Sequence, residues 1–104
     1  LPRSDELMRK HLTQEAYDRL NPNQYAAIAS IAYNTEESLK GDAGNRAKKT
    51  NTYLKNALNA PNLDFDEVER ALKMWNRSGN QVMDGLIRRR QSESDLFKKP
   101  PLRK

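Results

Sequence analysis

Cysteine is absent from this chain of 104 residues, and histidine occurs once, as His11. Without cysteine there is no disulfide, and no thiolate is available to bind a metal ion. A single histidine makes a zinc site only when several carboxylates join it. The composition therefore predicts no metal site, and we expect His11 to lie on the surface or half-buried in the first helix.

Long apolar stretches are also missing. No apolar run approaches the roughly 18 residues that span a bilayer, and no basic-then-apolar signal segment stands at the amino terminus. Hydrophobic residues make up 36% of the chain and charged residues 32%, so we expect a soluble domain with a narrow core built from one-sided helical stripes. Because residue 1 is leucine and not methionine, we interpret it as a processing or other boundary.

Basic residues outnumber acidic ones. The 19 Lys and Arg against 14 Asp and Glu give a formal charge of +5, with a sequence pI of about 9.6. This balance favours polyanionic partners, namely nucleic acid, an acidic membrane surface or the phosphates of a bacterial wall, with simple solubility as an equal alternative. The run Arg88, Arg89 and Arg90 does not form one patch, because consecutive helical residues point about 100° apart. We therefore rank nucleic-acid binding lowest.

Cap residues and apolar spacing predict an all-α fold of about five short helices around one buried central helix. Ser4 is expected to cap a first helix whose apolar stripe continues to Leu20. Asn21 is expected to cap the central helix, which ends at Asn34 and is the most apolar stretch of the chain.

The second half of the chain is predicted to hold three more helices. Residues 36–50 are polar and contain two glycines, so we expect a loop there. A short helix over 53–58 is followed by one over 64–75, opened by a capping box of Asp64 and Glu67, and by a last helix over 84–97. We expect no strand pair. Residues 1–97 form a single lobe in this interpretation, and 98–104 form a basic tail.

Two segments carry a familiar pattern in the same order. Residues 20–34 read LNPNQYAAIASIAYN, and residues 71–97 read ALKMWNRSGNQVMDGLIRRRQSESDLF. They resemble the bacteriophage-type lysozyme (endolysin, muramidase) family of glycoside hydrolases. That family shows a Gln-x-aromatic, an apolar helix and an aromatic-Asn pair, and later a Trp, a Gly, Gly-Leu-x-Arg-Arg-Arg-x-x-Glu and a closing Leu-Phe. The resemblance spans roughly residues 4–97 and implies the carboxy-terminal lobe of such an enzyme, with no metal or organic cofactor.

The family's catalytic segment has no counterpart here. In the family, an amino-terminal lobe supplies a glutamate followed by Thr-x-Gly-x-Gly, and no glutamate of this chain is followed by such a stretch. Glycoside hydrolysis needs a carboxylic acid with a raised pKa and a second group across the bond. Most acids here look solvated, and the adjacent Glu36 and Glu37 do not straddle a sugar bond. We therefore carry over no catalytic residue and expect the catalytic lobe to be absent.

Substrate contacts are implied by the resemblance at Tyr33 and Asn34, with Asp84 on the rim in place of the family's usual proline. Asn34 has an alternative role as a carboxy-terminal helix cap. Trp75 is expected in the core, with sugar stacking as its alternative. Arg89 is expected to pair with Glu93 along the helix surface. Structural roles are also predicted for three further residues, Gly79, Gly85 and a half-buried Arg90 whose guanidinium binds backbone carbonyls.

Three functional hypotheses follow from these observations. The first is a peptidoglycan-facing lobe of a phage-type lysozyme, which cuts the β-1,4 bond between N-acetylmuramic acid and N-acetylglucosamine with the help of a separate catalytic lobe. It would act at the periplasm or cell wall of the host bacterium, or from the virion. The second is a non-catalytic lysozyme-derived piece of a virion or tail that binds a partner protein. The third is a small basic nucleic-acid-binding domain.

Overall fold

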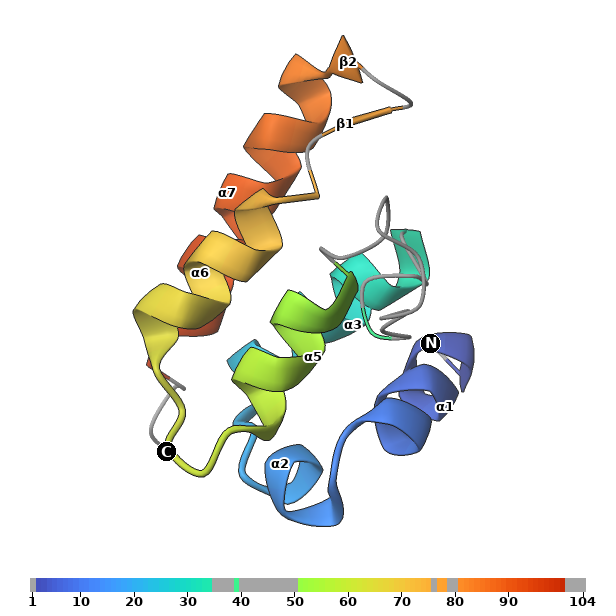
Figure 1. Ribbon diagram of the computed structural model, residues 1–104, viewed down its shortest axis with the longest axis vertical. Helices are drawn as coiled ribbons and strands as arrows, with labels where there is room; N and C mark the ends of the chain where they lie inside the picture. Colours follow the sequence, from blue (N-terminus) through green and yellow to red (C-terminus); the bar gives the residue numbers. More distant parts are fainter. Residues whose placement is uncertain (1, 35–38, 40–50, 76, 79–80, 101–104) are drawn as a thin grey trace.

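The structure, a computed structural model, describes residues 2–34, 39, 51–75, 77–78 and 81–100. Helices dominate these residues and confirm the all-α fold (Figure 1). One two-residue antiparallel pair is present, with Arg77 opposite Val82, so the expectation of no strand pair was wrong. The elements are α1 (Pro2–His11), α2 (Gln14–Asp18), α3 (Pro22–Asn34), α5 (Asn51–Asn59), α6 (Phe65–Lys73), β1 (Arg77–Ser78), β2 (Gln81–Val82) and α7 (Asp84–Lys98).

The predicted first helix is divided into α1 and α2. Thr13 stands between them as the N-cap of α2, and its Oγ1 accepts a hydrogen bond from the Ala16 amide at 3.0 Å. Asn59 at the end of α5 closes the break. Its Oδ1 accepts from the Thr13 amide at 2.9 Å, and its Nδ2 donates to the His11 carbonyl at 3.1 Å. The prediction of one continuous helix was wrong, because Thr13 caps a new helix and a side chain 46 residues away stabilises the break.

Ser4 does not cap α1, which begins two residues earlier at Pro2. Its side chain is buried, and its hydroxyl donates to the Ala29 carbonyl at 3.0 Å. A small polar residue here lets α1 approach α3 closely while the hydroxyl remains hydrogen-bonded. Ser4 therefore joins two helices.

Asp5 ties α1 to α2 and α3 through its carboxylate. The hydroxyls of Tyr17 and Tyr25 donate to Oδ1 at 2.6 and 2.7 Å, and Arg9 Nε donates to Oδ2 at 2.7 Å. These donors, the Tyr17 hydroxyl first, hold the pKa of Asp5 well below its usual value because they stabilise the charged form.

The central helix is α3, as predicted. Asn21 and Gln24 form a reciprocal capping box: Asn21 Oδ1 accepts from the Gln24 amide at 2.8 Å, and Gln24 Oε1 accepts from the Asn21 amide at 2.9 Å. α3 packs chiefly against α7 and α1. Its buried side chains form the middle of the core, namely Gln24, Ala27, Ile28, Ala29, Ile31 and Ala32.

α5 and α6 form the next pair, and both lie where the sequence predicts them. Asp64 caps α6 by accepting from the Asp66 and Glu67 amides at 3.0 and 3.3 Å. The reciprocal half of the expected capping box is not among the described contacts, because the Glu67 carboxylate pairs with Arg70 one turn later.

Arg19 holds the turn between α5 and α6. Its guanidinium donates to three carbonyls, those of Leu58 at 2.7 Å, Ala60 at 2.5 Å and Pro61 at 3.0 Å. Free carbonyls at a helix end need such donors. The residue after α2 thereby caps α5 and fixes the start of the connection to α6.

Several predictions fall on residues outside the described ranges. They include the basic loop at 46–49, the stop at Gly79 and the end of the tail at 101–104. Leu39 was placed in the 36–50 loop, but it is helical and buried in the core. Lys98, the first residue of the expected tail, is the last residue of α7.

Candidate functional site

α3 and α7 run antiparallel, and this sets where the predicted substrate residues lie. Asn23 near the start of α3 donates to the carbonyls of Lys99 and Pro100, both at 3.1 Å, whereas Ser30 Oγ donates to Glu93 Oε2 at 2.6 Å. At 1.5 Å per residue, Asp84 projects about 7–8 Å beyond the end of α3 at Asn34. The carboxyl end of α3 and the start of α7 therefore lie toward the same end of this antiparallel pair, a direction that can be followed in Figure 1.

Tyr33 and Asn34 are both exposed at this end. The Tyr33 side chain is 60% exposed, the largest fraction among the exposed large hydrophobic residues of the described chain. Asn34 Nδ2 donates to the Ser30 carbonyl at 2.8 Å, so its amide nitrogen serves the helix end. An exposed ring and an exposed side-chain amide are chemically suited to contact a polar polymer such as a glycan.

Asp84 is exposed at the start of α7. The N-cap position belongs to Met83, which makes no side-chain cap bond. Its negative charge lies in the first turn, where the helix dipole favours it. Gly85 follows in open space, since a Cβ built there meets nothing within 4 Å.

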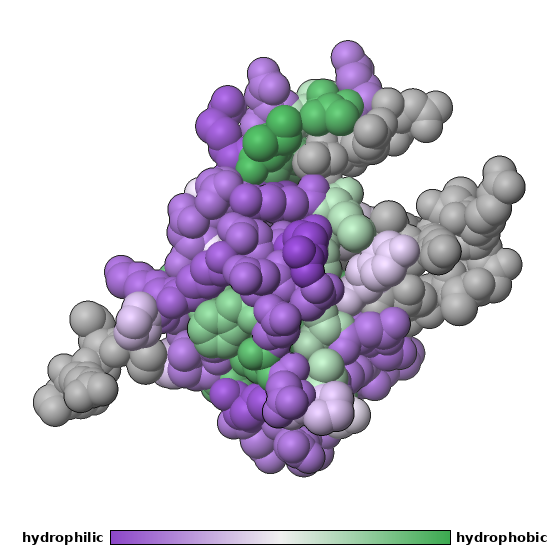
Figure 2. Space-filling view, turned by 60° about the vertical axis from the view of Figure 1, so that its left-hand side comes forward, coloured by the Kyte–Doolittle hydropathy of each residue, from purple (hydrophilic) through white to green (hydrophobic). Residues whose placement is uncertain are grey.

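Apolar side chains gather over β2 and the first turns of α7, as Figure 2 shows. Val82, Met83 and Ile87 are each more than 40% exposed. Next to them, Met83, Gly85, Leu86 and Arg89 line a shallow hollow of about 420 Å³. Apolar groups grouped on one surface point to a contact with another molecule.

Arg90 and Glu93 form a buried ion pair. Arg90 is completely buried and Glu93 is 4% exposed, and Arg90 Nε approaches Glu93 Oε1 to 2.8 Å. This approach is a charge contact and not an aligned hydrogen bond, and among the described residues the Arg90 guanidinium has no hydrogen-bond partner. Burial lowers the pKa of Arg90 and raises the pKa of Glu93, while the Ser30 hydroxyl and the opposite charge act against the second shift.

Three expectations about this motif are corrected. Arg90 is fully buried instead of half-buried, and it faces a carboxylate instead of backbone carbonyls. Arg89 is exposed and does not pair with Glu93, which points inward. Glu93 is the exception to the expected solvated acids, but its enclosure beside Arg90 keeps it from reaching a sugar bond.

Trp75 follows the end of α6 and packs, partly buried, against the core. Its indole Nε1 is buried and has no hydrogen-bond partner among the described residues. The ring is therefore not an open platform at the surface.

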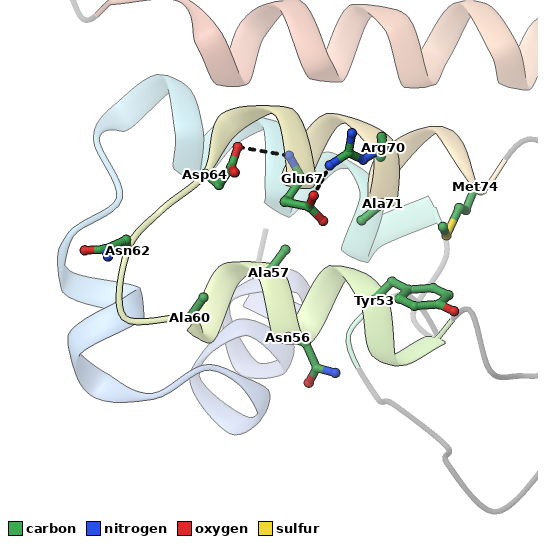
Figure 3. Close-up of a pocket in the computed structure, with 10 residues that line it drawn as sticks. All are labelled: Tyr53, Asn56, Ala57, Ala60, Asn62, Asp64, Glu67, Arg70, Ala71 and Met74. Carbon is green, nitrogen blue, oxygen red and sulfur yellow. Dashed lines mark hydrogen bonds and ion pairs between the residues drawn. The ribbon is translucent and has the colours of Figure 1, made fainter.

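A second concave surface, which the sequence analysis missed, lies between α5 and α6. This groove has a volume of about 470 Å³, and Figure 3 shows Ala57 and Ala71 facing each other across it. Ala71 is 3% exposed and belongs to the core, and Ala57 is partly buried against it, so the apolar spacing of these helices gave no sign of a groove. The groove is lined by Tyr53, Asn56, Ala57, Ala60, Asn62, Asp64, Glu67, Arg70, Ala71 and Met74.

Metal ligands do not cluster in the described part of the chain, where no three His, Cys, Asp or Glu side chains come together. Within the same residues, no helix combines the length and apolar character that a bilayer crossing requires.

Comparison with known proteins agrees with the family resemblance of residues 20–34 and 71–97. The family model described as phage lysozyme matches residues 3–93. The chain belongs to this family. It is also similar to an endolysin of Bacillus phage B103, with 34% identity over 93 residues. That alignment covers 89% of this chain but 28% of the relative, so the chain spans less than a third of that endolysin's length. No solved structure matches the chain.

Proposed function

We propose that this chain is the peptidoglycan-facing lobe of a phage-type lysozyme. In this role the α3/α7 end, with Tyr33, Asn34 and Asp84, lies against the murein strand. Hydrolysis at the β-1,4 bond between N-acetylmuramic acid and N-acetylglucosamine then takes place beside it, at the host cell wall. The observation that carries the proposal is membership of the phage lysozyme family over residues 3–93, together with the exposure of Tyr33 and Asn34.

The described carboxylates support a division of labour between two lobes. Retaining and inverting glycosidases both need two groups on opposite sides of the sugar bond, with one acid protonated. Burial raises the pKa of Glu93, but this residue is 4% exposed and faces Arg90. We therefore infer that a glutamate-bearing lobe outside these 104 residues supplies the chemistry.

The exposed apolar end supports contact with such a lobe. Val82, Met83 and Ile87 project beside the proposed glycan surface, and a protein contact that covers them would remove apolar area from water. The same patch would serve a virion protein if the chain were a structural component, which is the alternative that the experiment below separates.

Pelleting with purified sacculi tests the proposal. The chain is mixed with sacculi, bound protein is measured in the pellet, and reducing sugar is measured in the supernatant. We expect binding without sugar release, and we expect Tyr33→Ala combined with Asn34→Ala to reduce binding about tenfold, a loss of about 1.4 kcal/mol. Ser92→Ala, at an exposed position of α7, is the control and should bind as the unchanged chain does.

Two outcomes contradict parts of the proposal. If the unchanged chain does not pellet, it does not face murein, and a stable complex with a virion protein would then favour the structural alternative. If the chain alone releases reducing sugar, catalysis does not need a second lobe.

A further inference from the structure

The α5/α6 groove has an apolar floor and one aromatic end. Ala57, Ala60 and Ala71 point into it (Figure 3). Ala71 lies at the bottom of the groove, 3% exposed and part of the core, whereas Ala57 and Ala60 are partly buried. Tyr53 and Met74, each 40% exposed, stand together at the far end from Ala60. The result is a trough that presents a ring, a thioether and methyl groups.

The charged groups that line the groove are two carboxylates, Asp64 and Glu67, and one guanidinium, Arg70, so acidic groups outnumber basic ones. Glu67 points into the trough and pairs with Arg70. Asp64 directs Oδ1 to two backbone amides of its own helix. No lining cation is left without a counterion, although the chain as a whole carries +5. A polyanion would find no attractive charge here, and an uncharged ligand fits this lining better.

We propose that the α5/α6 groove is a second carbohydrate site, which binds an uncharged stretch of N-acetylated amino sugar. The Tyr53 ring covers the C–H face of a sugar, and acetamido methyl groups lie against the alanines. The Glu67–Arg70 pair exchanges hydrogen bonds with hydroxyl and amide groups, since a carboxylate accepts and a guanidinium donates. The choice of carbohydrate rests on the proposed function, whereas the groove and its charge are properties of this chain.

This site is formed by other elements than the α3/α7 end. The end is formed by the carboxyl terminus of α3 and the start of α7, and the groove is formed by α5 and α6. A lobe that holds a strand at two places dissociates more slowly than one that holds it once, because the second contact forms at high effective concentration. The groove thereby increases retention on a polymer without taking part in the reaction.

Titration with N-acetylchitohexaose, an uncharged hexamer of N-acetylglucosamine, tests the inference. Amide chemical shifts of the full chain are followed by NMR during the titration. We expect shifts along α5 and α6. Tyr53→Ala should weaken binding about tenfold, and Tyr53→Phe should bind almost as the unchanged chain does, because stacking needs the ring and not the hydroxyl. Ala57→Leu should also weaken binding, because its side chain fills the trough.

Tyr33→Ala is the matched control, since it removes an exposed tyrosine from the other surface. It should leave the α5/α6 shifts unchanged while reducing pelleting with sacculi. Thermal unfolding of each variant checks that the fold is kept. The chemical-shift changes of the unchanged chain locate the binding site without relying on any substitution.

Each result separates the two proposals. Shifts confined to the α3/α7 end, or full binding by Tyr53→Ala, would overturn the groove site and leave the proposed function intact. No binding of the hexamer together with no pelleting would overturn both. Shifts along α5 and α6 with duplex DNA in place of the sugar would overturn the assignment to an uncharged ligand.

Discussion

Replacing Arg90 with methionine removes one partner of a buried ion pair while keeping a long side chain in the core. Glu93 would then be left 4% exposed with the Ser30 hydroxyl as its described hydrogen-bond donor. Breaking a buried pair in this way costs about 3–5 kcal/mol, because the remaining charge has lost its compensation. Domains of this size have a total stability of about 5–15 kcal/mol. We therefore expect Arg90→Met to remove a large part of the folding free energy.

The double variant Arg90→Met, Glu93→Met separates the cost of an unpaired charge from the value of the pair. Apolar replacement of both partners is often neutral or stabilising. We therefore expect the free energy of unfolding of the double variant to lie within about 2 kcal/mol of that of the unchanged chain and well above that of the Arg90→Met variant. Arg89→Met is the control at the neighbouring exposed position, and it should change stability by about 0.5 kcal/mol or less.

Urea unfolding followed by circular dichroism measures these differences, with equal slopes required before the free energies are compared. The pH dependence has a definite sign. Burial raises the pKa of Glu93 above its ordinary value of 4.5, so protonation favours the native state as the pH falls toward that value. The loss in unfolding free energy caused by Arg90→Met should therefore be smaller at pH 4.5 than at pH 7. The reasoning would be refuted if Arg90→Met lost no more stability than Arg89→Met. It would also be refuted if the double variant lost as much stability as Arg90→Met and Glu93→Met do together.

Substitutions at three further residues probe the contacts between helices. Arg19→Met should cost about 1.5–3 kcal/mol in urea unfolding, because three carbonyls lose a charged donor. Arg19→Lys should recover only part of it, since an ammonium lacks the planar fork. Asp5→Asn should make the free energy of unfolding depend less on pH below about pH 4. The lowered native pKa of Asp5 contributes stability that is lost as the pH falls. An unchanged pH dependence would contradict this. Glu69→Gln should do the same between pH 4.5 and about 2, since Lys98, then Ser94 and Lys73, lower the pKa of Glu69 to about 2.

The sequence was sufficient to predict the helices whose cap residues and apolar stripes lie within or next to the helix itself. Asn21 with Gln24, and Asp64 at the start of α6, are local signals, and the structure confirms both starts. The break between α1 and α2 was not predictable in this way, because the apolar stripe continues through it. Thr13 caps α2 locally, but the hydrogen bonds of Asn59 to the two sides of the break span 46 and 48 residues and leave no periodic trace.

The candidate site shows the same limit at the level of single residues. Spacing alone places Arg89 one helical turn from Glu93, which is why a surface pair was expected. Packing of α7 on α3 decides otherwise, since Ser30 meets Glu93 and turns that face inward. The groove between α5 and α6 was missed for a related reason. Ala71 is buried in the core and Ala57 packs against it, so their spacing gives no sign of the groove beside them.

Burial also changes how the arginine run contributes to binding. Of the three guanidinium groups, the one on Arg90 is enclosed with a carboxylate, so that pair adds no net charge at the surface. Arg88 and Arg89 remain exposed, and Arg89 lines the hollow beside Met83. Among the described residues at this end, the groups open to a ligand are two cations, an acid at Asp84 and apolar side chains, which form a mixed surface and not a basic one. A protein lobe or a polar glycan fits such a surface, whereas a nucleic acid requires a continuous row of cations.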